Sequence, residues 1–368
     1  MNKLMSYNFL SYKKTLIYLF FIFLLIIYLS NYIFLSELTN PNIFFHWYNQ
    51  DQYLINYNDH GFVKRGLIGF IFKINLNNYN ILTKIIVTVN LCLILTLYLL
   101  IINSFKNIEL KKYLILFSIS PFFLYQLGFD FGRFDHFGIL IFLLIVLFII
   151  QNRSILFFEI LLPFTILIHE ILFFSLVIFV IYFQILIKRN RFIIYYTIFS
   201  SFLILILLFF FGGMEPEYID KYKDKYWFVN TYFTKGHLES SMSLWLTDVF
   251  KFKTTIFYRH FISILIFIYC LSIIFKQSND FFLKSVLIIF SLCFILGIDH
   301  ARFLSIFFFN LTMIYLIKLK RNEIYFQLPK FKNYFWLIVF MGPWGVNICL
   351  PILTILKKAI FYGTLTFN

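Results

Sequence analysis

The sequence predicts an all-α protein, a polytopic bundle of helices in a membrane, and three observations support this class. Of the 368 residues, 61% are hydrophobic and only 13% are charged, whereas a soluble globular domain carries roughly 25% charged residues. The mean hydropathy is +0.84. Apolar runs recur along nearly the whole chain and leave no stretch that could form a separate aqueous core. We therefore expect one transmembrane domain over residues 1–368.

The formal net charge of +15 is compatible with a membrane protein. Much of the excess positive charge lies in short loops between apolar runs, where the positive-inside rule places it, so nucleic acid is not an expected partner. The four cysteines all lie inside apolar runs without CxxC spacing. This pattern indicates neither a disulfide framework nor a zinc site.

About eleven transmembrane helices are expected, because about 20 apolar residues cross roughly 30 Å of hydrocarbon. The first, near 15–35, follows several lysines and has no small-residue cleavage site after it. We therefore expect a retained helix and a cytoplasmic N-terminus. The other spans are expected near 81–103, 112–128, 137–151, 154–168, 169–187, 192–211, 256–275, 281–298, 303–317 and 334–352. Two larger loops, 36–80 and 212–255, then lie on the outer face.

The stretch 154–187 is ambiguous, because its apolar run is either one very long helix or two short ones. We expect two, broken near Pro163 and His169, since short interior helices and a proline break are tolerated where protein or a water-filled cavity covers the backbone. The resulting topology places more basic residues in the short cytoplasmic loops than in the short outer ones, as the positive-inside rule requires.

Histidines and acidic residues collect on the outer face of this predicted topology. All seven histidines fall in outer loops or at outer helix ends. The acidic residues do so as well, except Glu109, Glu159, Asp280 and Glu323. Histidine and carboxylate on one face of a membrane protein are the groups needed for general acid–base catalysis or for cation binding.

The first outer loop combines acids and aromatics with two cations. Asp51 follows an aromatic pair, and Asp59 precedes Lys64 and Arg65. These two cations stand on the side that the positive-inside rule disfavours. They are candidates to bind the phosphate of an anionic substrate, Arg65 as a bidentate fork and Lys64 as a point charge. The alternative is two cations that reach lipid headgroups.

A five-residue pattern, Asp-x-small-Arg-Phe, occurs twice at outer helix ends. The first copy and its continuation contain Asp130, Arg133, Asp135 and His136, and the second contains Asp299, His300 and Arg302. Asp and Arg at positions i and i+3 are neighbours on a helix and can pair, which would aim the arginine at a substrate phosphate with the acids and histidines in support. The alternative is two structural ion pairs that tie helix ends together.

His169 and Glu170 interrupt an otherwise apolar stretch and are candidate catalytic residues, because such a pair can relay a proton or orient each other. Phe173 stands where an HExxH motif needs its second histidine, and no Asp-x-Asp motif occurs. No metal ligand is therefore assigned, although a divalent cation stays an alternative. The loop 212–255 interleaves aromatic rings with carboxylates, a mixture that suits sugar rings and, equally, a membrane interface.

The first outer loop resembles that of the glycosyltransferase-C superfamily, in which an acidic residue is followed by a stretch rich in Trp and Tyr. Trp47, Tyr48 and Asp51 carry the resemblance, with the aromatics before the acid. Arg133-Phe134-Asp135, ahead of an apolar run, is similar to the same superfamily. The resemblance implies that Asp51 deprotonates the acceptor hydroxyl, with Asp59 as its substitute.

The organisation also resembles the O-antigen and capsule polymerases of the Wzy type, which share this size and span number, a long outer loop in the second half and essential outer arginines. The outer arginines here are Arg65, Arg133, Arg259 and Arg302. In both families the substrate is a sugar on a polyprenyl phosphate or pyrophosphate at the outer face. Cations for the phosphate and a carboxylate or histidine base are then needed together.

These resemblances imply a glycosyl-transferring enzyme of the bacterial inner membrane that polymerises lipid-linked repeat units. Three alternatives stay open: a glycosyltransferase that adds a single sugar, a proton-coupled transporter or flippase of lipid-linked glycan, and a non-catalytic scaffold. The expected partners are a polyprenyl-linked oligosaccharide, membrane lipids and other membrane proteins of polysaccharide assembly. No cofactor is indicated.

Overall fold

The computed structural model describes residues 52–75, 77–119, 132–213, 254–296 and 300–324. Within these ranges every regular element is helical, which confirms the expected all-α class. The expected spans 15–35 and 334–352 lie outside the described residues, as do residues 214–253 of the loop 212–255.

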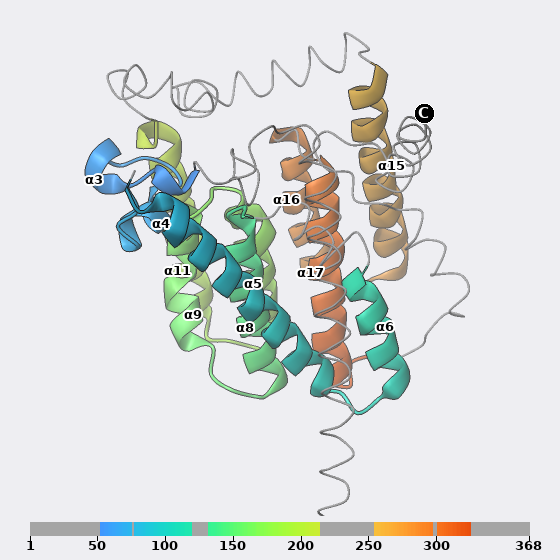
Figure 1. Cartoon of the computed structure of the whole chain (residues 1–368). Coiled ribbons are helices and arrows are strands. Elements are labelled where there is room, and N and C mark those ends of the chain that lie inside the picture. The colour runs from blue at the N-terminus through green and yellow to red at the C-terminus, as the bar shows by residue number, and fades with distance from the viewer. Residues whose placement is uncertain (1–51, 76, 120–131, 214–253, 297–299, 325–368) are drawn as a thin grey trace, which may run out of the picture.

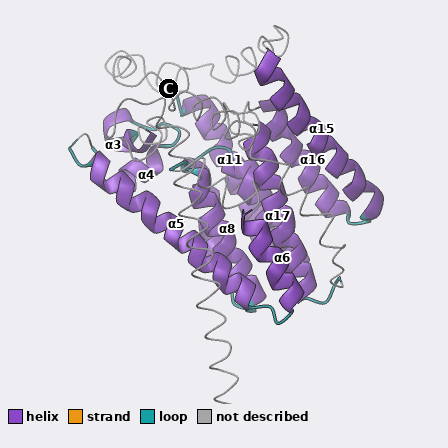
Figure 2. Cartoon of the chain, turned by 45° about the vertical axis from the view of Figure 1, so that its right-hand side comes forward, coloured by secondary structure: helices purple, strands orange, loops and turns teal. Residues whose placement is uncertain are grey.

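Seven long helices form the body of the described protein, and each overlaps a predicted span. They are α5 (Tyr79–Asn103), α6 (Ile108–Ile119), α8 (Asp135–Ile150), α11 (Arg191–Phe211), α15 (Thr254–Gln277), α16 (Phe281–Leu296) and α17 (His300–Lys320). In Figure 1 they stand roughly side by side, with α5 inclined across α8. Figure 2 shows the described connections from α5 to α6 and from α15 to α16 as short loops at the ends of these helices.

Within the described ranges, three helical stretches are long and apolar enough to cross a membrane: Ile81–Asn103, Arg191–Phe211 and Arg302–Lys320. Several other apolar helices, among them α8, are shorter. The chain is therefore a helical protein suited to a membrane, while the number of spans and their orientation stay predictions.

The stretch 154–187 contains the predicted break. Its first part is α9 (Leu156–Leu161) continued by the 3₁₀ helix η2 (Leu162–Leu167), and its second part is the π-helix η3 (Phe173–Val177) continued by α10 (Ile178–Leu186). Pro163 lies in the first turn of η2, where its missing N–H is tolerated. The first half packs on α11, and the second half packs on α8, α11, α16 and α17, so protein lies against both irregular stretches.

The first predicted outer loop contains short helices that the sequence did not predict: η1 (Gln52–Leu54), α3 (Tyr57–His60) and α4 (Gly66–Ile71). The segment folds back on itself at Gly69, where an added Cβ would press against the carbonyl oxygen of Ile55. The backbone N–H of Lys64 donates to the carbonyl oxygen of Gly212 over 3.1 Å, which ties the segment to the end of α11.

Three neighbouring helical segments, α8, η3–α10 and α17, run in the same direction. Arg302 at the start of α17 lies 3.3 Å from Asp135 at the start of α8, whereas Ile150, Ile187 and Ile317 near the three C-terminal ends line one pocket. We call the end of the bundle at which these three segments begin the histidine end. The end at which they terminate is the basic end. The 16 residues of α8 separate the two ends by roughly 24 Å.

Aromatic side chains fill the interior between the two ends. The ring of Phe142 stacks on Phe183 at 5.3 Å between centroids, and Phe179 meets Phe290 edge-on at 5.6 Å. Phe290 also stacks on Phe307 at 5.9 Å. Because this core is apolar, the charged groups at the two ends are insulated from each other and can be considered separately.

Candidate functional site

Charged residues from four separate parts of the chain converge at the histidine end. Lys64 and Arg65 precede α4, Arg133 precedes α8, and Arg302 lies in the first turn of α17. Asp135 and His136 begin α8, and His169 and Glu170 occupy the break between η2 and η3. The structure thus brings together residues that the sequence placed in three unrelated motifs.

Arg65 and Glu170 form a bidentate ion pair across 105 residues of sequence. The Nε atom of Arg65 donates to one carboxylate oxygen of Glu170 over 3.1 Å, and Nη2 donates to the other over 2.5 Å. The side chain of Arg65 is 9% exposed. Such a fork fixes the direction of the guanidinium, because both of its hydrogen bonds lie in one plane.

The backbone of Arg65 is unusual for a residue with a side chain. Its φ of 67° lies in the left-handed region, which is uncommon outside glycine. The next residue is Gly66, where an added Cβ would lie 2.5 Å from the ring of Tyr57. Residues held in such sparsely populated conformations cluster at functional sites, where surrounding contacts enforce them.

His169 is buried beside Glu170 at the break. Its Nδ1 atom lies 3.5 Å from a carboxylate oxygen of Glu170 and accepts a hydrogen bond from the backbone N–H of Ile171 over 3.2 Å. An Nδ1 that accepts a hydrogen bond carries no proton, so the neutral ring holds its proton on Nε2. His169 also interacts electrostatically with Arg65, Asp135 and Arg302.

Arg302 and Asp135 join the two copies of the Asp-x-small-Arg-Phe pattern. The guanidinium Nη1 of Arg302 lies 3.3 Å from Oδ2 of Asp135, and their side chains are 11% and 6% exposed. The guanidinium also lies over the ring of Phe303, 5.3 Å from its centroid. Among the described residues, neither carboxylate oxygen of Asp135 accepts a hydrogen bond. The carboxylate of Asp135 is therefore stabilised by the positive charge of Arg302, and it also interacts electrostatically with Arg133 and His169.

Lys64 adds a fourth cation to the cluster. Burial lowers the pKa of its ammonium below the ordinary value, the carboxylate of Glu170 opposes this shift, and the neighbouring Arg65 adds to it. The shift therefore reflects mainly the loss of solvation around the ammonium. By formal charge, the cations of the described cluster, namely Lys64, Arg65, Arg133 and Arg302, outnumber its two carboxylates, Asp135 and Glu170. An anion that entered the cluster would be attracted by this excess.

The supporting histidines have different surroundings. His136 is buried beside Asp135 and interacts electrostatically with Arg133. His300 lies within hydrogen-bonding distance of the carbonyl oxygen of Phe294, 2.8 Å from its Nε2, and its ring stacks on that of Phe294. His300 therefore connects the end of α16 to the start of α17.

Asp59 takes part in a local cap. Its backbone N–H donates to the side-chain oxygen of Asn56, and its carboxylate accepts from the Asn56 amide over 2.7 Å. These contacts start α3 and leave Asp59 outside the set of interacting charges described above. Asp51, Asp130 and Asp299 lie outside the described residues, as does the side chain of Arg259.

The π-helix beside the site was missed by the sequence interpretation. This π-helix, η3, begins at Phe173, shortly after Glu170. Within it, the carbonyl oxygen of Ser175 accepts a hydrogen bond from the side-chain amide of Asn310 over 2.7 Å. Single π-turns inside helices are frequent at functional sites. The signal available in the sequence was a polar asparagine, buried in an apolar span of α17.

No metal centre is found among the described residues, where no three His, Cys, Asp or Glu side chains gather closely enough. What the cluster offers is cationic binding of an anion, through its guanidinium and ammonium groups, together with a histidine and an acid able to exchange protons. Comparison with known proteins finds no matching family model and no significant match to a curated protein or a solved structure.

Proposed function

We propose that this chain is a glycosyl-transferring enzyme of the bacterial inner membrane. Its donors are sugars linked to polyprenyl phosphate or pyrophosphate at the outer face. In this proposal it polymerises the repeat units of an O-antigen or capsule. The observation that carries the proposal is the buried convergence of Lys64, Arg65 and Arg302 with Asp135 and His169. Both the cations and the proton-exchanging groups that this reaction needs occur in one cluster.

The lipid phosphate is the group assigned to the cations. In this proposal Arg302, which lies 3.3 Å from Asp135 at the start of α8, also contacts a phosphate oxygen. Arg65 is held in direction by Glu170 and contributes its positive charge beside the same anion. The starts of α8 and α17 add positive partial charge at this end.

The reaction breaks the bond between the anomeric carbon and the phosphate oxygen and forms a bond from that carbon to an acceptor hydroxyl. The hydroxyl proton passes to a base, and the lipid phosphate or pyrophosphate leaves with its negative charge. In this proposal the cations stabilise the leaving group, which is where charge develops. His169 and Asp135 are the described base candidates, with Asp51 as the base implied by the resemblance, and Glu170 positions Arg65 and His169.

The test is a gel of surface glycans from a strain that lacks this gene, complemented by wild type, by Arg302→Ala or by Lys112→Ala. Lys112 is an exposed cation whose amine binds Glu109 in α6, so it serves as the control. A polymerase predicts that Arg302→Ala abolishes the ladder while a single repeat unit is retained, and that Lys112→Ala restores the ladder.

Two other results of the same gel have definite meanings. A lost or shortened repeat unit would identify a transferase that adds one sugar. A ladder that is unchanged by deletion of the gene would contradict both forms of the proposal.

One observation favours a second candidate function, a transporter or flippase of lipid-linked glycan. The two half-length segments α9–η2 and η3–α10 meet at His169 and Glu170, and interrupted helices with ionisable groups at the break are a feature of secondary transporters. A transporter predicts that deletion leaves complete lipid-linked repeat units on the cytoplasmic side. An enzyme predicts that they reach the outer side and stay unpolymerised there.

A further inference from the structure

The basic end is built from three helix ends with the same geometry. After α8, α10 and α17 the chain turns through a residue with positive φ: Asn152 at 55°, Lys188 at 56° and Asn322 at 57°. In each case the following backbone N–H donates back into the last turn, over 2.8 Å to Phe148, 2.9 Å to Gln184 and 3.0 Å to Lys318. These are Schellman-type caps, which occupy carbonyl groups that would otherwise face an incoming ligand.

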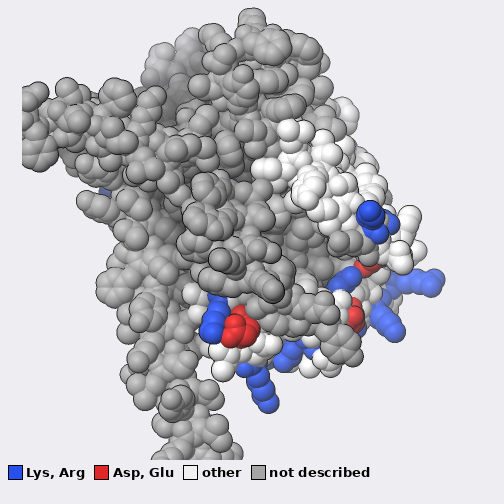
Figure 3. Space-filling model, turned by 90° about the vertical axis from the view of Figure 1, so that its right-hand side faces the viewer, with Lys and Arg blue, Asp and Glu red and all other residues white. Residues whose placement is uncertain are grey.

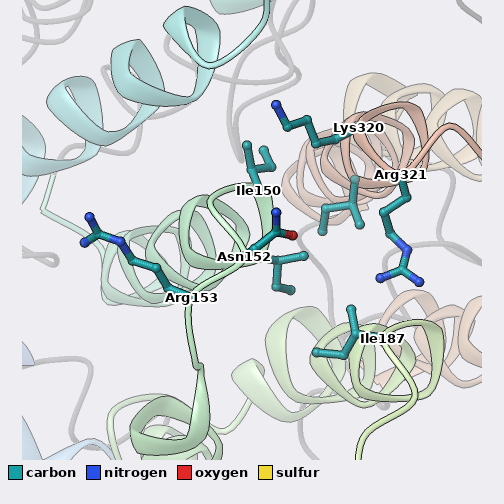
Figure 4. A pocket seen from close by; sticks show the side chains of 8 residues that line it. Ile150, Asn152, Arg153, Ile187, Lys320 and Arg321 are labelled. Atoms are coloured by element: carbon teal, nitrogen blue, oxygen red, sulfur yellow. The ribbon is translucent and has the colours of Figure 1, made fainter.

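A pocket of about 300 Å³ lies between these helix ends. Its walls consist of Ile149, Ile150, Ile187 and Ile317, and its polar lining consists of Asn152, Arg153, Lys320 and Arg321. Figure 4 shows Asn152 between isoleucines, with Lys320 and Arg321 extending to either side and Arg153 directed away. None of the described lining residues is acidic.

Two carboxylates of this end, Glu159 and Asp280, are matched by cations that do not line the pocket. Buried Glu159 accepts a bidentate pair of hydrogen bonds from Arg189. Asp280 accepts from Lys318 over 2.9 Å and from the hydroxyl of Tyr182 over 2.6 Å. Positive charge beyond these pairs therefore remains around the pocket.

The three lining cations are held only weakly by other groups in the described part of the chain. Arg153 lies over the ring of Phe148, 5.9 Å from its centroid. Arg321 donates to Glu323 in an exposed pair, a type that contributes little. Lys320 is exposed. All three side chains can therefore turn towards an anion without breaking a buried interaction.

We propose that this pocket binds the phosphate headgroup of an anionic phospholipid. Lys320, Arg321 and Arg153 contact the phosphate from the rim, the Asn152 amide donates to it, and the start of an acyl chain packs on the isoleucines. An isoleucine wall fits an acyl chain better than a free anion, and basic pockets between transmembrane helices are suited to anionic headgroups. Figure 3 shows that the Lys and Arg side chains on one face of the molecule gather towards its lower part, below a largely uncharged surface. The proposal is independent of the function assigned to the histidine end.

The experiment measures phospholipid binding to the full-length purified protein by native mass spectrometry, with phosphatidylglycerol and phosphatidylcholine as probes. Wild type is expected to prefer phosphatidylglycerol. Lys320→Gln is expected to weaken phosphatidylglycerol binding about fivefold, and Lys320→Gln with Arg153→Gln more than tenfold, since each cation near the surface contributes a comparable factor. Both side chains are exposed, so the variants should fold.

Lys112→Gln is the matched control, because Lys112 is an exposed cation near the start of α6 and does not line the pocket. It is expected to keep the wild-type preference. Inorganic phosphate at millimolar concentration distinguishes the source of the anion: displacement of phosphatidylglycerol would show a site for free phosphate and overturn the lipid assignment. Equal binding of the two phospholipids, or a double variant that binds like the control, would overturn the proposal itself.

Discussion

The two ends of the bundle both hold buried charge, but they pair it differently. At the basic end, buried Glu159 receives bidentate hydrogen bonds from Arg189, and Asp280 accepts from three donors. At the histidine end, Asp135 is equally buried, yet within the described residues its oxygens accept no hydrogen bond. A carboxylate that is fully matched stabilises the fold. A carboxylate that is held mainly by surrounding cations, without hydrogen bonds of its own, marks a place where those cations can also contact an anionic ligand.

The pKa of Asp280 illustrates the matched case. Burial alone would raise it, but hydrogen bonds from Tyr182, the backbone N–H of Leu283 and Lys318 lower it below the usual value for an aspartate. Asp280 precedes α16 and accepts from the backbone at its start. The carboxylate therefore acts as a connection between α10, α16 and α17, and no ligand is needed to explain it.

The largest expected effect is on activity at the histidine end. Arg302→Ala should lower glycosyl transfer about 10²- to 10³-fold, because removal of a group that stabilises developing charge has effects of this size. Arg302→Lys keeps the charge and loses the fork, so it should retain only a small part of the activity. The measurement is polymer formed per amount of protein in the membrane. Activity of Arg302→Ala within threefold of wild type would remove Arg302 from the site.

The second effect is on stability at the basic end. Glu159→Ala should lower the free energy of unfolding by about 1–3 kcal/mol, because it removes the charge-assisted hydrogen bonds from Arg189, whose side chain is 26% exposed and can be solvated. Activity per folded molecule should stay near that of wild type. Unfolding by a denaturing detergent, followed by helical circular dichroism, measures the first quantity. If Glu159→Ala removed activity without loss of stability, the contrast between the two ends would be wrong.

A glycine pair tests how the first outer segment presents Arg65. Gly69→Ala should destabilise by about 1–3 kcal/mol and lower activity as well, because the added methyl collides with the backbone of Ile55. Gly61→Ala meets nothing within 4 Å, but its φ of 66° and ψ of −158° lie in a region that is essentially restricted to glycine, so the strain should cost about 1–3 kcal/mol. Equal loss of activity in the two variants would show that the packing of α4 does not position the site.

The smallest effect concerns the hydroxyl on Asp280. Tyr182→Phe should reduce stability by about 1 kcal/mol at neutral pH, the contribution of one hydrogen bond. Because the folded pKa of Asp280 is below its unfolded value, its contribution is present above the unfolded pKa and is lost as the pH falls through the folded one. The difference between Tyr182→Phe and wild type should therefore shrink below about pH 4. A difference that is constant with pH would contradict this linkage.

The sequence predicted the helices and the broken stretch well, because those features are local. Apolar runs define the spans, and Pro163 with His169 marks the break. The short helices α3 and α4 were missed because four and six residues give no periodic signal. Their formation depends on caps and on the close approach at Gly69.

The partners of the charged residues could not be predicted, because they depend on how the helices pack. The sequence favoured pairs within each Asp-x-small-Arg-Phe copy, but Asp130 and Asp299 lie outside the described residues and those pairs stay predictions. The described structure instead brings Arg302 to Asp135 of the other copy, and Arg65 to Glu170. The first contact requires α8 and α17 to run parallel, and the second requires the segment before α4 to pack against the break before η3; no local pattern encodes either.

The central claim is that the charge cluster at the histidine end performs glycosyl transfer. The most direct test is the surface-glycan gel with two variants that retain the positive charge. Arg302→Lys removes a guanidinium fork from the cluster, and Lys112→Arg changes an exposed cation in α6 in the opposite sense. In the deletion strain, Arg302→Lys is predicted to leave mainly the single repeat unit with at most a faint ladder, whereas Lys112→Arg restores the full ladder. A full ladder from Arg302→Lys at normal protein levels would contradict the claim.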